Sequence, residues 1–325
     1  MRVEENSLKN IIKEIKSYPG ITRKRNIHLI TDALQTVKNF GDIVADFGED
    51  AAVIKSGDEF LLFAVDGMWS GLIEANPYNA GKASIMVNVN DIYAMGGRPI
   101  ALINVIGVPD DSYYPELVRG IKKGCEKFRV PMVGGHLHPD TKEASLSVSI
   151  LGKAKKLLLS DNARVGQDII FAVDLAGQGY QCSPVISWDT NSGKSTDQVL
   201  ERLEVLPFIA EKGLCSTAKD VSNGGLLGTI ALLLESSKKG AIINLNRIPK
   251  PDSFIFIDWL KAFLSYGFIL TSDKANTDQI IAEFTKKRIN AAVIGEIKEK
   301  REFRLLFNDE DEVLYDLEKE PITGL

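Results

Sequence analysis

The sequence predicts an α/β protein in which layered sheets and helices form two domains. Short apolar segments typical of strands alternate with helical segments in both halves of the chain. The chain is 325 residues long, which exceeds the usual range of a single hydrophobic core. The lysine-rich residues 153–156 and the turn at 164–168 separate the alternating segments of the first half from those of the second. We therefore expect domains at residues 1–160 and 161–325.

Each expected element follows from its local pattern. In the first half the expected strands are residues 61–65, 101–108, 132–133 and 145–151, and the expected helices are residues 79–95 and 114–128. In the second half the expected strands are residues 169–173, 241–245, 268–271 and 292–297, and the expected helices end at Gly213 or span residues 224–236 and 277–288.

Residues 176–197 form a long polar segment without a clear period. Such a segment is either an ordinary surface loop or a functional binding loop. Trp188 beside Asp189 favours a loop that holds a substrate, because an aromatic ring next to an acid can bind one.

Composition excludes several classes of protein. The net charge of −5 argues against a nucleic-acid partner, and the short basic cluster at residues 23–25 is either a solvated face or a local phosphate contact. The three cysteines form no CxxC pair, which fits free thiols in a reducing compartment. The N-terminus is charged, and the longest apolar run, residues 226–234, is too short to span a bilayer. We therefore expect a cytoplasmic protein without a membrane partner.

The helix at residues 79–95 carries the most informative polar residues. Ser84, Asn88 and Asp91 stand at positions i, i+4 and i+7, which places them on one face. The rest of the helix is mostly apolar, and a buried carboxylate is costly unless a cation or several donors compensate it. A polar stripe facing solvent or a satisfied core aspartate is the alternative.

Further acidic residues stand at strand ends. Asp50 lies in a loop before a short apolar strand, and Asp66 ends the strand that begins near residue 59. A third strand ends in Gly134, Gly135 and His136. Asp50, Asp66 and Asp91 can thus meet at one sheet edge, where oxygen ligands suit Mg²⁺. Magnesium held by few carboxylates shares its other positions with water and phosphate, so the pattern indicates a nucleoside triphosphate.

Taken in order, these motifs resemble a known family. They are Gly-Glu-Asp-Ala-Ala at residues 48–52, Ala-Val-Asp-Gly at 64–67, Val-Asn-Val-Asn-Asp-Ile-Tyr-Ala-Met-Gly-Gly-Arg-Pro at 87–99, Val-Gly-Gly-His at 133–136 and Ala-Lys-Asp-Val-Ser-Asn-Gly-Gly at 218–225. Over roughly residues 20–310 the chain resembles the aminoimidazole ribonucleotide (AIR) synthase superfamily, which includes thiamine-monophosphate kinase, selenophosphate synthetase and HypE. Asp66-Gly67-Met68-Trp69 is most similar to the uncharacterised AIR-synthase-related branch.

The resemblance implies a fold and an activity. It implies a PurM-like N-terminal domain that pairs in a homodimer to close a β-barrel, followed by a PurM-like C-terminal α/β sandwich. It also implies an ATP- and Mg²⁺-dependent enzyme that uses the γ-phosphate to activate a small-molecule acceptor. The implied metal ligands are Asp50, Asp66, Asp91 and Asp220.

The same resemblance assigns the remaining site residues. Gly134 and Gly135 would contact phosphate through their N–H groups, and Asn88 would orient Asp91 or bind a metal-bound water. His136 is the candidate for acid–base catalysis or a phosphate contact, because a free histidine titrates near neutrality.

Two departures and two alternatives qualify the assignment. The first cysteine is Cys125, so the reactive N-terminal cysteine of selenophosphate synthetase is missing, and residues 321–325 lack the carrier cysteine of HypE. A metal-dependent hydrolase using His136, His138 and Asp140 is one alternative. A non-catalytic nucleotide-binding protein is the other.

Overall fold

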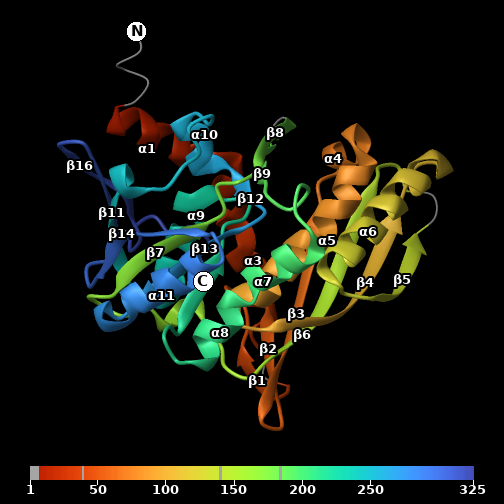
Figure 1. Cartoon of the computed structure of the whole chain (residues 1–325), viewed down its shortest axis with the longest axis horizontal. Helices are drawn as coiled ribbons and strands as arrows, with labels where there is room; N and C mark the ends of the chain where they lie inside the picture. Colours follow the sequence, from red (N-terminus) through yellow and green to blue (C-terminus); the bar gives the residue numbers. More distant parts are fainter. Residues whose placement is uncertain (1–6, 39, 139–140, 183–184) are drawn as a thin grey trace.

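The computed structural model describes residues 7–38, 40–138, 141–182 and 185–325, which fold into two mixed α/β halves lying side by side (Figure 1). Helices and strands alternate in both halves, so the expected α/β class is confirmed. None of the helices described is long and apolar enough to cross a membrane.

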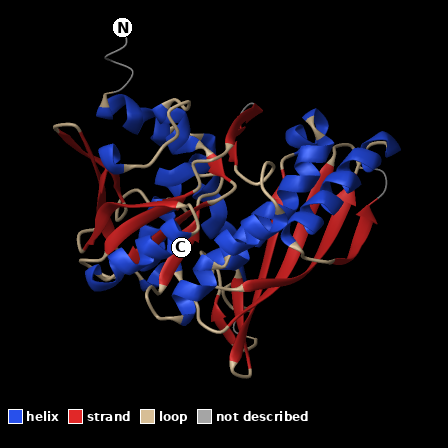
Figure 2. Cartoon of the chain, in the orientation of Figure 1, coloured by secondary structure: helices blue, strands red, loops and turns tan. Residues whose placement is uncertain are grey.

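The first half is built on one sheet with helices on one face. Its strand order among the described residues is β1-β2-β3-β6-β4-β5, that is, Ile43–Ala45, Ala52–Ser56, Glu59–Met68, Ser145–Ala154, Arg98–Gly107 and Met132–His138. The helices of this half are α4 (Ser70–Ala75), α5 (Pro77–Ala94), the short η2 (Asp111–Tyr113) and α6 (Tyr114–Phe128). Figure 2 shows the helices covering one face of this sheet and leaving the other bare. The sheet is open within the described chain, and closure into a barrel by two chains stays a prediction.

The two faces of this sheet differ in exposure. Leu62 and Leu102 lie on the inner face and are 0% and 1% exposed. Phe63, Val65 and Ile103 lie on the outer face and are 48%, 61% and 45% exposed. Because side chains alternate along a strand, the apolar residues of β3 and β4 cover both faces, although α5 and α6 bury only one of them.

The second half contains a larger sheet and a small one. The larger has the order β10-β13-β7-β14-β11-β15-β16, that is, Thr217–Asp220, Gly267–Ser272, Asp168–Val173, Asn290–Lys298, Gly240–Asn244, Glu302–Phe307 and Glu310–Asp316. The smaller has the order β12-β9-β8, that is, Phe263–Leu264, Val185–Asp189 and Gln178–Cys182. The helical segments are η3 (Ser160–Asn162), α7 (Thr196–Leu203), α8 (Val205–Glu211), α9 (Gly225–Ser237), η4 (Leu245–Arg247), α10 (Phe256–Lys261) and α11 (Lys274–Lys286).

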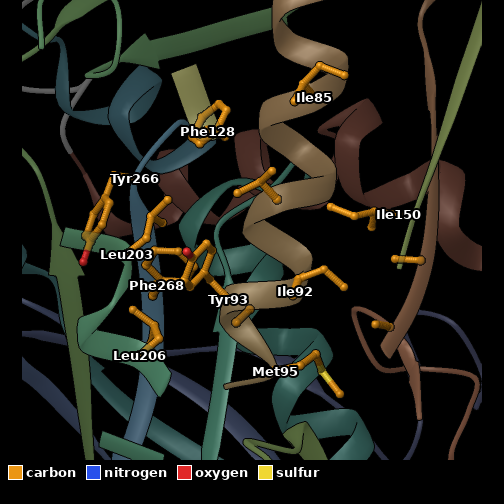
Figure 3. Packing of buried hydrophobic residues seen from close by; sticks show 14 of the residues in the cluster. Ile85, Ile92, Tyr93, Met95, Phe128, Ile150, Leu203, Leu206, Tyr266 and Phe268 are labelled. Atoms are coloured by element: carbon orange, nitrogen blue, oxygen red, sulfur yellow. The ribbon is translucent and has the colours of Figure 1, made fainter. Parts of the chain in front are cut away.

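Helix α5 lies at the junction of the halves and contacts both. Asn76 caps its first turn by accepting from Asn79 N–H at 3.0 Å. Ile92 points toward Ile150 in the first sheet, and Tyr93 points the other way, toward Phe268 (Figure 3). The helix is apolar on several sides because both halves bury it, and Asp91, which is half-buried by surface area, lies at the junction.

The N-terminal segment packs with the second half. Its elements are α1 (Leu8–Lys16), α2 (Pro19–Thr22), η1 (Arg23–Asn26) and α3 (Ile27–Leu34). Leu8, Ile11 and Ile15 are buried in the core of the second half. The proposed division at residue 160 stays a prediction, but these residues precede it and still belong to the second core.

Two expectations about loops were wrong. The strand at residues 132–133 does not end at the glycine pair, because β5 continues to His138. Residues 176–197 are not a structureless loop, since they contain β8, β9 and the start of α7. Trp188 is 3% exposed, donates to the Asp174 carbonyl oxygen at 2.9 Å and packs against Trp259, so it serves the core.

Candidate active site

Four carboxylates that are far apart in the sequence meet at the junction of the halves. They are Asp50 in the loop before β2, Asp66 on β3, Asp91 on α5 and Asp220 at the end of β10. Asp91 interacts electrostatically with the other three, and the Asp220 N–H donates to Asp50 Oδ2 at 3.4 Å. The fold thus brings together the acidic residues that the sequence singled out.

These carboxylates perturb one another. Burial raises the pKa of Asp91 well above its usual range, and the charges of Asp220, Asp66 and Asp50 raise it further. The pKa of Asp220 is raised well above its usual range by burial first and then by Asp50. Burial also raises the pKa of Asp66. Ionising these carboxyl groups together at neutral pH requires compensating positive charge.

Two lysines bring positive charge to the carboxylates. Lys219 Nζ donates to Asp50 Oδ1 and, at 3.2 Å, to the Gly48 carbonyl oxygen. The side chains of Lys219 and Asp50 are 7% and 9% exposed, so they form a buried ion pair. Lys24 on η1 lies close enough for its charge to lower the pKa of Asp66. Whether the basic cluster contacts phosphate or is a solvated face stays a prediction.

The two adjacent acids of the 48–52 motif have different partners. The Ser160 N–H donates to both carboxylate oxygens of Glu49 at 3.0 Å, which ties the loop to the start of the second half. Asp50 instead turns toward the other carboxylates. Gly48 has φ +103°, in the left-handed region, and this allows the tight loop that separates the two acids.

Asn88 has an unused oxygen near this site. Its Nδ2 donates to the Ser84 carbonyl oxygen at 2.8 Å, and Ser84 Oγ donates to the Gly81 carbonyl oxygen at 2.8 Å. Asn88 Oδ1 is buried and has no hydrogen-bond partner among the described residues. Leaving a buried acceptor unpaired costs about 1–3 kcal/mol. Since Asn88 stands one turn before Asp91 on the same helix face, this oxygen is available to a bound group.

His136 lies on the other face of the first sheet from Asp66. In the register of the sheet it pairs with Val105, which is 44% exposed on the outer face. Asp66 pairs with Val148, which is 0% exposed on the inner face. His136 and Asp66 therefore lie on opposite sides of the sheet, and the catalytic role of His136 stays a prediction.

The glycine pair lies inside the edge strand β5. A Cβ on Gly135 would lie 2.1 Å from Asn104 Oδ1, so close packing there requires glycine. A Cβ on Gly134 would meet only Ile103 Cγ2, at 3.5 Å. Packing explains one glycine of the pair, and the expected phosphate contact of both stays a prediction.

The residues of the hydrolase alternative are partly described. The rings of His136 and His138 lie 6.4 Å apart in an edge-to-face arrangement. Asp140 lies outside the described residues. Within the described ranges, no group of three or more His, Cys, Asp or Glu side chains that could hold a metal ion is found, at this loop or at the junction.

Lys219 is a site residue that the motif patterns did not single out. Its only signal is its place beside Asp220 at the end of an apolar strand, where a lysine is unexpected unless it is paired.

The fold and the junction define a class of two-domain α/β proteins with an acidic site between the halves. The chain belongs to the AIR synthase related protein family: residues 48–154 match its N-terminal domain and residues 165–308 its C-terminal domain. It is 42% identical over 327 residues to an uncharacterized protein of Methanocaldococcus jannaschii, an alignment that covers 98% of this chain and 99% of the relative. It is 26% identical over 269 residues to the thiamine-monophosphate kinase of Pyrococcus horikoshii, covering 78% of this chain and 83% of that one.

Solved structures share the fold. AaThiL complexed with AMPPCP and TMP matches with a TM-score of 0.65 at 19% identity, covering 87% of this chain and 93% of that one. T. maritima PurL complexed with ATP matches with a TM-score of 0.70 at 19% identity, covering 89% of this chain and 51% of that one. The chain therefore spans about half the length of the PurL chain.

Proposed function

We propose that this protein is an ATP- and Mg²⁺-dependent phosphotransferase or synthetase that activates a small-molecule acceptor with the γ-phosphate. The observation that carries the proposal is the meeting of Asp50, Asp66, Asp91 and Asp220 with two lysines at the junction of the halves. The names of relatives support the same chemistry, since they include thiamine-monophosphate kinases and a selenide, water dikinase.

The donor set fits magnesium shared with a nucleotide. Mg²⁺ at substrate phosphates usually takes only one or two protein carboxylates and completes its shell with water and phosphate oxygens. The junction needs no preformed cage of three ligands for such a site. Asp91 and Asp220 offer hard oxygen donors, and the unpaired Oδ1 of Asn88 can bind a metal-bound water.

The residues of the chain would mainly position groups and balance charge. Bound Mg²⁺ would neutralise the charge on the phosphate oxygens during transfer. Asp50, Asp66, Asp91 and Asp220 would hold the metal in place. Lys24, at the edge of the cluster, would contact phosphate, while Glu49 keeps the loop of Asp50 fixed to Ser160.

The same proposal includes a homodimer through the bare face of the first sheet. Phe63, Val65, Ile103 and Val105 form an exposed apolar surface there, which is 44–61% exposed in the single chain. Contiguous apolar surface of this kind marks an interface in many proteins, and a second copy of the same sheet would cover it in a closed pair. His136 lies on this face, so it would act at the interface between two chains.

A structure with AMPPCP and Mg²⁺ tests the assignment directly. We expect the phosphates and the metal beside Asp66, Asp91 and Asp220. Nucleotide bound elsewhere, with the carboxylates left unchanged, would contradict it. Stoichiometric zinc at His136 and His138 in that crystal would favour the hydrolase instead. Nucleotide bound without any release of ADP across a panel of acceptors would favour the non-catalytic alternative.

A further inference from the structure

Asp50 already has a partner on each carboxylate oxygen. Lys219 Nζ donates to Oδ1, and the backbone N–H of Asp220 lies 3.4 Å from Oδ2. The ammonium also donates to the Gly48 carbonyl oxygen, so it is anchored at a fixed place in the loop. A divalent metal ion at Asp50 would have the Lys219 ammonium beside it at Oδ1, so the two cations would compete for the same carboxylate charge.

Lys219 is well placed to serve as the cation of this site. Its side chain is 7% exposed, and the negative charges of Asp50, Glu49 and Asp220 surround it. Among these, Glu49 is held by Ser160, which leaves Asp50 as the carboxylate bound directly to the ammonium. A buried pair of this kind is strongly disrupted when one partner is removed.

We propose that Lys219 is an internal counter-cation that competes with the divalent metal for Asp50. In the protein without nucleotide, its ammonium balances the carboxylates and keeps the four acidic side chains together. Asp50 would hold a divalent metal in exchange for the Lys219 ammonium, which would then be free to balance phosphate charge. The inference rests on the proposed function, because it assumes that the metal binds at this junction.

The proposed competition predicts that metal affinity rises when the Lys219 ammonium is removed. A lysine that supports metal binding, or one that only packs in the core, predicts a lower or unchanged affinity. If the ammonium helped the metal to bind, its removal would weaken metal binding. Removing a competitor would strengthen metal binding, since Asp50 would then have an unpaired oxygen and a less compensated charge. The direction of the change in affinity therefore decides between the two roles.

The test uses Mn²⁺ as the probe and reads free Mn²⁺ by electron paramagnetic resonance, without nucleotide and then with AMPPCP. The variants are Lys219→Met, Lys219→Gln, which keeps a donor for Gly48, and Lys219→Arg, which keeps the charge. We expect Lys219→Met and Lys219→Gln to bind Mn²⁺ without nucleotide roughly tenfold more tightly than the wild type, and Lys219→Arg to resemble the wild type. The control Lys239→Met removes a lysine that is paired with Glu299 and not with an acid of the junction, and it should leave this affinity unchanged.

Thermal unfolding gives a second readout if a variant is poorly stable. Added Mn²⁺ should raise the melting temperature of Lys219→Gln more than that of the wild type, because the metal replaces the missing ammonium. Equal or weaker Mn²⁺ binding in both neutral variants, relative to the wild type, would overturn the inference. The proposed function would stay intact in that case if the wild type binds Mn²⁺ with AMPPCP. Absence of Mn²⁺ binding in every protein, even with AMPPCP, would overturn both.

Discussion

His136 and Asp66 lie on opposite faces of the same sheet, in adjacent rows of its hydrogen-bond register. The sequence motifs assign both residues to one site, but the sheet places them on different sides. Asp66 faces α5 and the other carboxylates, whereas His136 faces the exposed apolar surface. A catalytic role for His136 therefore depends on a second chain.

Replacing His136 tests that role. We expect His136→Asn to bind Mg²⁺–ATP nearly normally and to consume ATP at least roughly a hundredfold more slowly, the usual scale for a lost general acid or base. His138→Asn is the matched control and should have a smaller effect. Loss of stoichiometric zinc in both variants, read by elemental analysis, would show that the loop is a metal site and the ATP interpretation of it is wrong.

The apolar face can be tested separately from the chemistry. We expect the wild type to be a dimer by light scattering and Val65→Glu to be a folded monomer, because a buried unpaired charge is costly at an interface. Ile255→Glu is the matched control, since Ile255 is 68% exposed on the second half and Val65 is 61% exposed on the bare face. A monomeric wild type at micromolar concentration, or a Val65→Glu dimer, would contradict the proposed interface.

The two glycines of β5 should respond differently to alanine. Gly135→Ala places a methyl group against Asn104, so we expect a loss of about 1–3 kcal/mol in the free energy of unfolding. Gly134→Ala meets only ordinary contact and should change that free energy by less than about 1 kcal/mol. Urea denaturation measures both. Equal effects of the two substitutions would mean that Asn104 does not define the requirement for glycine.

The Cys215 thiol should be unreactive until the protein unfolds. Burial raises the pKa of Cys215 to about 12, so the native thiol remains protonated at pH 8. Because the folded pKa is raised, the associated stability is complete below the unfolded pKa and is lost as the pH rises toward about 12. We expect alkylation by iodoacetamide at pH 8 to be roughly a thousandfold slower in the native state than in urea, read by mass spectrometry of the Cys215 peptide. Comparable rates in both states would show that Cys215 is not buried in solution.

The helix at residues 79–95 and the grouping of the acidic residues could be predicted because both depend on short sequence patterns. Apolar residues around Asp91 indicated burial, and the structure places that residue beside Asp50, Asp66 and Asp220. The same reasoning failed for Trp188, since only the packing of Trp259 and Phe254 reveals that it is a core residue.

Long-range partners were beyond the reach of local patterns. Lys219 and Asp50 are 169 residues apart, and no periodicity relates them. The face on which His136 lies depends on the register between β4 and β5, where a shift of one residue reverses every side chain. Sequence motifs therefore identified the acidic set but not its counter-cation or the orientation of the histidine.

The central claim is that the carboxylates at the junction bind ATP through Mg²⁺, and a calorimetric titration of ATP in Mg²⁺ and in EDTA tests it most directly. Without the metal, phosphates and carboxylates repel, so we expect binding in Mg²⁺ to be at least roughly tenfold tighter than in EDTA. Asp91→Asn should weaken binding in Mg²⁺ strongly, whereas Asp58→Asn, on the exposed turn between β2 and β3, should not. Equal affinity of the wild type for ATP in EDTA and in Mg²⁺ would contradict the account.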